Sequence, residues 1–121
     1  MSAINDTEWR VLAALWDSDG ATLGQVVEAL REDTGWSRNT VLTYLTRMEK
    51  KGLVVIDKDP YPHLYRAAVD RADCQASQRR DFLERVYRGS AGDLVAAFLK
   101  EEKLSAQDRE RLRRMLDEME V

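Results

Sequence analysis

Apolar positions recur at helical spacing in three successive runs near the start of the chain. A first helix is predicted to start at residues 5–8 and to end at 17–20, burying the side chains Trp9, Leu12, Ala13, Leu15 and Trp16. A second helix is predicted from residues 22–25 to near Gly35, and a third from Ser37 to Gly52. Residues 5–8 and 22–25 both have the pattern of a capping box, which marks the start of a helix.

Two short strands are predicted after the third helix. Residues 53–56 and 64–69 have strand-like composition, whereas the intervening residues 57–63 contain two prolines, which suit a hairpin loop. Three helices followed by a hairpin is the element order of a winged helix-turn-helix. We therefore predict a winged-helix domain over residues 1–70.

Residues 71–121 return to helical patterns, each with a narrow apolar stripe and a strongly charged opposite side. Asp70, Ser90 and Ser105 stand where N-caps are expected. Because one chain has little with which to cover such stripes, we expect two chains to pair along them. The side chains expected at this contact are Phe82, Val86, Leu94, Val95, Phe98, Leu99, Leu112, Met115, Leu116 and Met119. The alternative is a monomer whose C-terminal helices fold back on its own N-terminal domain.

The predicted fold class is therefore mainly α with a small β-hairpin. It consists of a winged helix-turn-helix domain plus a C-terminal helical dimerisation region, residues 71–121.

The third predicted helix has an unusual outer side. At 100° per residue, one side carries the apolar residues Val41, Tyr44, Leu45 and Met48. The opposite side carries Asn39, Thr43, Thr46, Arg47 and Lys50, with Leu42 at its border. Thr and Asn form helices less readily than Glu, Lys or Gln, so their presence indicates a chemical use. Small polar side chains can reach base edges in the major groove, and basic ones can pair with phosphates.

Charge is distributed unevenly along the chain. The whole sequence of 121 residues has a formal net charge of −3, which by itself argues against a nucleic-acid partner. Residues 37–66, however, contain six basic and three acidic residues, whereas the remainder contains 13 basic and 19 acidic ones. Since the local field matters most to a ligand within a Debye length, the third helix and hairpin favour binding to double-stranded DNA.

The residues expected to contact DNA lie on the third helix, at its two ends and on the hairpin. They are Ser37, Arg38, Asn39, Thr40, Thr43, Thr46, Arg47, Lys50, Lys51, Lys58, Tyr61, His63 and Arg66. The alternative function is a winged-helix protein–protein interaction module, which would require an apolar outer side on the third helix.

An enzyme is the least favoured class. One His, one Cys and no glycine-rich phosphate loop provide no catalytic constellation, no metal site and no expected cofactor. The role of Cys74 is left open. No apolar run is long enough to cross a bilayer and no signal peptide is evident, which predicts a cytoplasmic protein without a membrane partner.

Several motifs together resemble the penicillinase repressor family (BlaI/MecI/CopY type). They are TEWRVL at 7–12, LW at 15–16, QVVEAL at 25–30, GW at 35–36, TVLTYLTR at 40–47, KGL at 51–53, LYR at 64–66 and FLKEEKLS at 98–105. The resemblance implies a homodimeric winged-helix repressor of transcription that binds a palindromic operator. It also implies that Thr40, Thr43 and Arg47 match the family's DNA-contacting positions, whereas Asn39 and Leu42 stand where some members carry basic residues.

Members of the antibiotic-sensing branch are inactivated by a sensor protease, commonly before a Phe that follows Asn. The corresponding pair here is Ala97 and Phe98, which retains the Phe but not the Asn. Cleavage at this bond is therefore a hypothesis that the resemblance suggests, and an apolar contact in the dimer is the alternative role of Phe98. The cysteine-rich metal motif of copper-responsive members is absent from this sequence.

Overall fold

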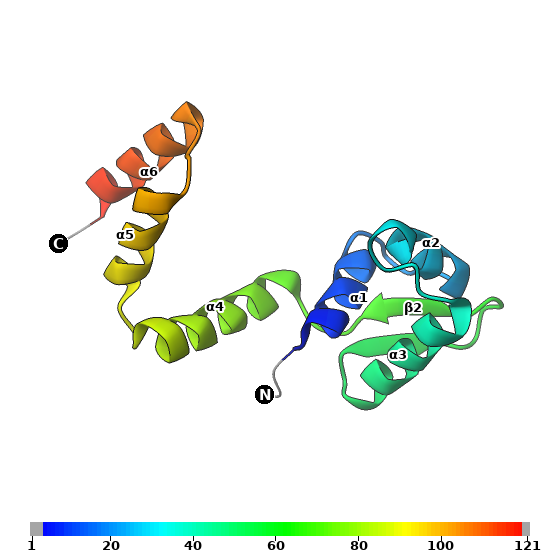
Figure 1. Ribbon diagram of the computed structural model, residues 1–121. Helices are drawn as coiled ribbons and strands as arrows, with labels where there is room; N and C mark the ends of the chain where they lie inside the picture. Colours follow the sequence, from blue (N-terminus) through cyan, green and yellow to red (C-terminus); the bar gives the residue numbers. More distant parts are fainter. Residues whose placement is uncertain (1–3, 120–121) are drawn as a thin grey trace. The chain divides into compact units, whose positions relative to one another are not determined.

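The computed structural model describes residues 4–119. Within this range it contains six helices and one two-stranded sheet (Figure 1). The elements are α1 (Asp6–Trp16), α2 (Leu23–Thr34), α3 (Arg38–Lys50), β1 (Val54–Asp57), β2 (Leu64–Ala67), α4 (Arg71–Tyr87), α5 (Ala91–Glu101) and α6 (Ala106–Glu118). The predicted fold class, mainly α with a small hairpin in a winged helix-turn-helix, is confirmed.

The chain divides into two compact units, and the boundary falls within α4, between Gln78 and Arg79. The first turns of α4 belong to the first unit. Cys74 is buried there, and the Gln78 side-chain amide donates to the Ile4 carbonyl at 3.3 Å.

The predicted capping boxes are both present. The Asn5 side chain accepts a hydrogen bond from the Glu8 N–H at 2.8 Å, and the Glu8 carboxylate accepts one from the Asn5 N–H at 3.1 Å. Thr22 and Gln25 form the same reciprocal pair at the start of α2. Gly35 ends α2 with a φ of 64°, a left-handed conformation that glycine adopts at no steric cost.

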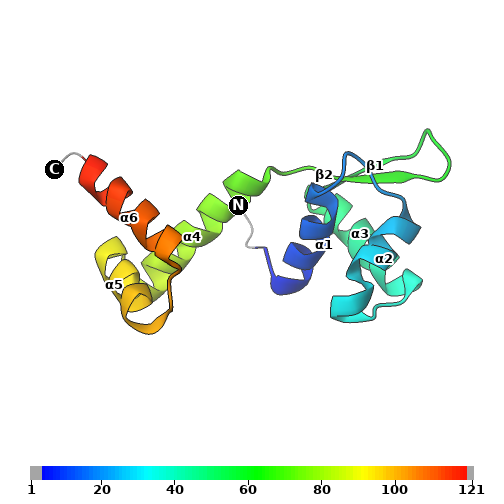
Figure 2. The same ribbon diagram turned by 90° about the horizontal axis from the view of Figure 1, so that it is seen from above.

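The hairpin pairs β1 and β2 antiparallel, with Val54 opposite Ala67 and Asp57 opposite Leu64. The predicted strands, 53–56 and 64–69, are displaced at their ends. The Leu53 N–H instead bonds to the Met48 carbonyl at 2.9 Å, which places Leu53 in the turn that follows α3. Figure 2 shows the loop between the strands extending past the helices of this unit, as a wing does.

Ala21 adds a further pairing that the sequence did not predict. Its N–H and carbonyl bond to the Tyr65 carbonyl and N–H at 3.0 and 2.8 Å. The connection between α1 and α2 is therefore attached to the free edge of β2, directly before the cap of α2.

The core of the first unit lies where the three helices meet the hairpin. Its buried side chains are Val11, Leu12, Leu15, Ala21, Val26, Leu30, Val41, Leu45, Met48, Leu53, Val54 and Tyr65. Val11 is fully buried although it was not among the predicted core residues, while Trp9, Ala13 and Trp16 are only half-buried. This packing holds α3 by one side and leaves the other side in solvent.

The second unit consists of the remainder of α4 with α5 and α6. Asp70, Ser90 and Ser105 accept backbone hydrogen bonds as the predicted caps of these helices. Neither α5 nor α6 contains a buried residue among those described. Of the helices within residues 4–119, none has the length and apolar character needed to cross a membrane.

Candidate nucleic-acid interface

Helix α3 presents the two sides that its sequence predicts. Val41, Leu45 and Met48 are buried, and Tyr44 packs on Trp36 with ring centroids 4.9 Å apart. The side chains exposed on the opposite side are Asn39, Leu42, Thr43, Thr46, Arg47 and Lys50. Leu42, expected at the border of this side, is 38% exposed.

The hydroxyls of the outer face bond to the helix itself. Thr43 donates to the Asn39 carbonyl and Thr46 to the Leu42 carbonyl, each at 2.9 Å. Both oxygens keep lone pairs that can accept a hydrogen bond from another molecule.

Ser37 caps the start of α3. Its hydroxyl oxygen accepts from the Thr40 N–H at 3.2 Å and its hydroxyl donates to the Thr40 hydroxyl at 3.0 Å. Ser37 and the half-buried Thr40 thus stabilise the helix start locally. The backbone N–H groups of this first turn give it a partial positive charge that favours phosphate.

A cleft of about 350 Å³ separates the start of α3 from the wing. Its walls come from the start of α2, the start of α3 and the loop between the strands, and they are Thr22, Leu23, Gly24, Arg38, Tyr61, Pro62, His63 and Tyr65. A Cβ on Gly24 would lie 3.8 Å from a terminal nitrogen of Arg38, so this guanidinium extends over the first turn of α2. The cleft brings together Arg38, Tyr61 and His63, three of the residues predicted to contact DNA. The sequence did not identify the α2 side, although the capping box at Thr22 marked that helix start.

Lys51 has a partner within the protein. Its ammonium bonds to a carboxylate oxygen of Glu8, whose side chain is only 8% exposed, while that of Lys51 is 37% exposed. The other Glu8 oxygen accepts the Asn5 N–H. This ion pair ties the end of α3 to the start of α1.

Two predicted wing residues lie apart from the cleft. Lys58 is exposed in the loop between the strands, and Arg66 is exposed on β2, directly opposite the exposed Val55. Because side chains alternate along a strand and Tyr65 points into the core, Arg66 lies on the sheet face away from the helices.

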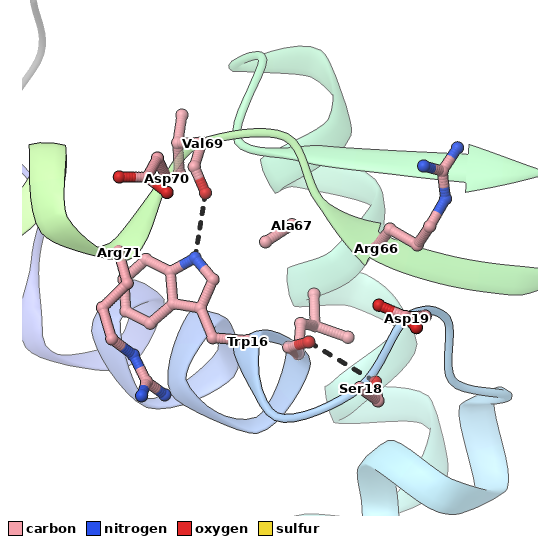
Figure 3. A pocket seen from close by; sticks show the side chains of 9 residues that line it. Trp16, Ser18, Asp19, Arg66, Ala67, Val69, Asp70 and Arg71 are labelled. Carbon is pink, nitrogen blue, oxygen red and sulfur yellow. Dashed lines mark hydrogen bonds between the residues drawn. The ribbon is translucent and has the colours of Figure 1, made fainter.

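A second hollow, of about 560 Å³, lies between the end of α1, the end of β2 and the start of α4. Figure 3 shows Trp16 and Arg71 on one side of it and Arg66 and Asp19 on the other. The Trp16 indole N–H donates to the Val69 carbonyl at 2.9 Å, and the Arg71 guanidinium lies 5.3 Å from the Trp16 ring centroid. Arg71 also pairs with Asp17 at 3.2 Å, so these contacts fasten the start of α4 to the end of α1.

Cys74 is buried in the first turns of α4. Burial raises the pKa of its thiol, and the negative charges of Asp73 and Asp70 raise the pKa further. A thiol that stays protonated is a poor nucleophile and a poor metal ligand. Within residues 4–119, no group of three His, Cys, Asp or Glu side chains is placed to hold a metal ion.

Known proteins match this chain over nearly its whole length. The family model described as penicillinase repressor matches residues 4–118. The methicillin resistance regulatory protein MecI of Staphylococcus aureus (strain N315) is 31% identical over 114 residues, which cover 94% of this chain and 93% of that protein. The penicillinase repressor of Bacillus licheniformis is 29% identical over 115 residues, which cover 95% of this chain and 90% of that protein.

A solved structure is similar as well. The solution structure of the Bacillus licheniformis BlaI monomeric form in complex with the blaP half-operator has a TM-score of 0.52 and 28% identity. The matched region covers 60% of this chain and 88% of the BlaI chain. The similarity in sequence and in fold therefore confirms the resemblance: the chain belongs to the penicillinase repressor family.

Proposed function

We propose that this chain is a DNA-binding repressor of transcription that recognises its operator through the outer face of α3. The division of α3 into a buried apolar side and an exposed side of Asn, Thr, Arg and Lys carries the proposal. A helix held by one side on a core, with small polar and basic side chains outward, fits the major groove. The operator complex of the similar Bacillus licheniformis structure supports this assignment. The protein acts in the cytoplasm, and no catalytic step is part of its function.

The cleft beside α3 supplies the contacts to the DNA backbone. Arg38 and His63 offer donors from two sides, and the starts of α2 and α3, which line the cleft, have the positive end of the helix dipole that favours phosphate. Contacts of this kind orient a protein on the duplex without reading its sequence. Lys58 adds a positive charge farther out on the wing.

Selection from a random oligonucleotide pool, followed by titration of the recovered sequence, tests the proposal. We expect enrichment of a two-fold symmetric sequence and binding that is tighter to it than to a scrambled duplex. Recovery of no preferred sequence would contradict a repressor and would favour the protein-interaction alternative.

We further propose that the repressor is a homodimer formed through α4–α6. The described part of the second unit exposes large apolar side chains: Phe82, Val86, Val95, Phe98, Leu99, Met115, Leu116 and Met119. Leu94 and Leu112 are half-buried beside them. Monomeric proteins rarely expose large apolar patches, and a second copy of the same chain would cover these side chains with the same residues. Two copies of α3 would then read two half-sites of a palindrome.

Phe98→Asp tests the dimer, because Phe98 is 54% exposed in α5 and a charge there would be buried on pairing. Ala91→Asp is the matched control, since it places the same residue at the exposed first position of α5. Sedimentation at micromolar concentration should give monomers for the Phe98 variant and dimers for the control. Dimers from both variants would exclude Phe98 from the interface, and monomers of the unmodified chain would exclude the dimer.

Release from the operator by proteolysis between Ala97 and Phe98 stays a hypothesis. The bond lies inside α5, and the Phe98 carbonyl accepts a hydrogen bond from the Glu102 N–H at 3.0 Å. A protease that binds its substrate extended therefore requires this helix to unwind first. Incubation with a sensor protease of the family, followed by intact-mass measurement, would reveal a cut at this bond, and an intact chain would end the hypothesis.

A further inference from the structure

The outer face of α3 includes an exposed apolar side chain at its border. Within residues 4–78, the large apolar side chains with high exposure are Leu42, Val55 and Tyr61, and Leu42 alone belongs to a helix. A single exposed leucine has little meaning by itself. Thr46, however, lies four residues after Leu42 and three after Thr43, so its side chain is beside both on the helix surface and joins the three into one patch.

The threonines present apolar groups to this patch. Each hydroxyl hydrogen is used within the helix, by the carbonyls of Asn39 and Leu42. Each oxygen is therefore left as an acceptor only, and the methyl group on the same Cβ is free of any polar partner. The patch formed by Leu42, Thr43 and Thr46 thus offers three apolar groups and two acceptors, and no donor.

An A·T pair is the base pair that complements such a patch. In the major groove it presents the thymine C5-methyl group for apolar contact and the adenine N6 amino group as a donor. A G·C pair likewise presents one donor, the cytosine N4 amino group, and two acceptors, guanine O6 and N7, so the methyl group, which it lacks, is what distinguishes the two pairs. Donors are found around the patch, on Asn39, Arg47 and Lys50.

We propose that Leu42, Thr43 and Thr46 read thymine methyl groups in each operator half-site, and that Leu42 is a specificity-determining residue. The inference rests on the proposed repressor function and names the part of the DNA that its recognition helix reads. Polar and basic side chains at the borders of the patch supply hydrogen bonds to other bases and to phosphates.

Replacement of single thymines by deoxyuridine in the recovered operator tests the inference. The exchange removes one methyl group and keeps the base pairing, the charge and every other groove atom. With the unmodified protein we expect at least one thymine per half-site at which the exchange weakens binding about fourfold, the equivalent of one buried methyl group.

Protein variants assign the contact to residues. Leu42→Ala or Thr43→Ser removes apolar groups, so the ratio of thymine to uracil affinity at a contacted position should fall towards one. Thr43→Val keeps the methyl and replaces the hydroxyl, so the ratio should persist. Asn39→Ala is the matched control on the same face, and it should leave the ratio unchanged. All three positions are exposed on α3, and thermal unfolding followed by circular dichroism verifies that each of the four variants folds.

The outcomes separate this inference from the repressor proposal. Sequence-specific binding that no uracil exchange weakens would overturn the reading of methyl groups and leave the repressor intact. A uracil effect that survives both Leu42→Ala and Thr43→Ser would overturn the assignment of that methyl contact to Leu42 and Thr43. Absence of any preferred sequence would contradict the repressor proposal itself.

Discussion

Replacement of Lys51 by methionine separates a structural role from a DNA-contacting one. The exchange keeps most of the apolar stem and removes the ammonium that bonds to Glu8. The Glu8 carboxylate would then keep a single hydrogen bond, from the Asn5 N–H at 3.1 Å, in a site where its side chain is 8% exposed. A charge left with too few partners in a buried site lowers the free energy of unfolding.

The size of the loss follows from the exposure of the two partners. Hydrogen bonds to charged groups contribute roughly 1.5–3 kcal/mol, whereas fully exposed ion pairs contribute about 0–1 kcal/mol. Because Glu8 is buried and Lys51 is 37% exposed, solvent screens part of the interaction. We expect Lys51→Met to lower the free energy of unfolding by about 1–2 kcal/mol, intermediate between these limits.

Urea unfolding at one fixed protein concentration measures this loss, with tryptophan fluorescence as the signal because Trp9 and Trp16 lie on α1. Lys50→Met is the matched control: it removes the same charge from the neighbouring residue, which is exposed on the outer face of α3. We expect Lys50→Met to weaken DNA binding and to leave unfolding nearly unchanged. The reasoning would be refuted if Lys51→Met left stability intact and weakened DNA binding as much as Lys50→Met.

Four further predictions concern Arg47, Thr43, Trp16 and Cys74. Arg47→Ala should weaken binding to operator and to random DNA alike and reduce the slope of log affinity against log salt by roughly one. Thr43→Ala should make the free energy of binding to the operator less favourable by about 1–3 kcal/mol and leave binding to random DNA unchanged. Equal losses of the Thr43 variant on both duplexes would contradict base reading. Trp16→Phe removes the indole N–H that bonds to the Val69 carbonyl and should lower the free energy of unfolding by about 1 kcal/mol in urea titrations. Because the pKa of the Cys74 thiol is raised above its ordinary 9.0, its contribution to stability is fully present below that pH and is lost as the pH rises above it. The free energy of unfolding measured from pH 7 to 10 should fall more steeply for the unmodified chain than for the control Cys74→Ala.

The helix starts and the two sides of α3 could be predicted because both depend on residues close together in the chain. A capping box joins positions three apart, as Asn5 and Glu8 show, and its geometry is the same in any protein. The 100° turn per residue likewise places Val41, Leu45 and Met48 on one side of α3 wherever that helix packs.

Strand ends and partners far along the chain could not be predicted in this way. Leu53 leaves the predicted strand because its N–H bonds to the end of α3. Ala21 pairs with Tyr65, although nothing in the residues next to Ala21 indicates a strand. These bonds depend on how the helices close over the hairpin, which is a property of the whole core.

The sequence alone thus determined the order of the elements, the caps of the helices and the side of α3 that meets solvent. Only the tertiary structure decided that Lys51 pairs with Glu8 and that Arg38 extends over Gly24 beside the wing. The physical reason is the range of the interactions. Backbone geometry fixes how residues a few positions apart are arranged, whereas residues separated by tens of positions meet only where packing of the buried side chains brings their elements together.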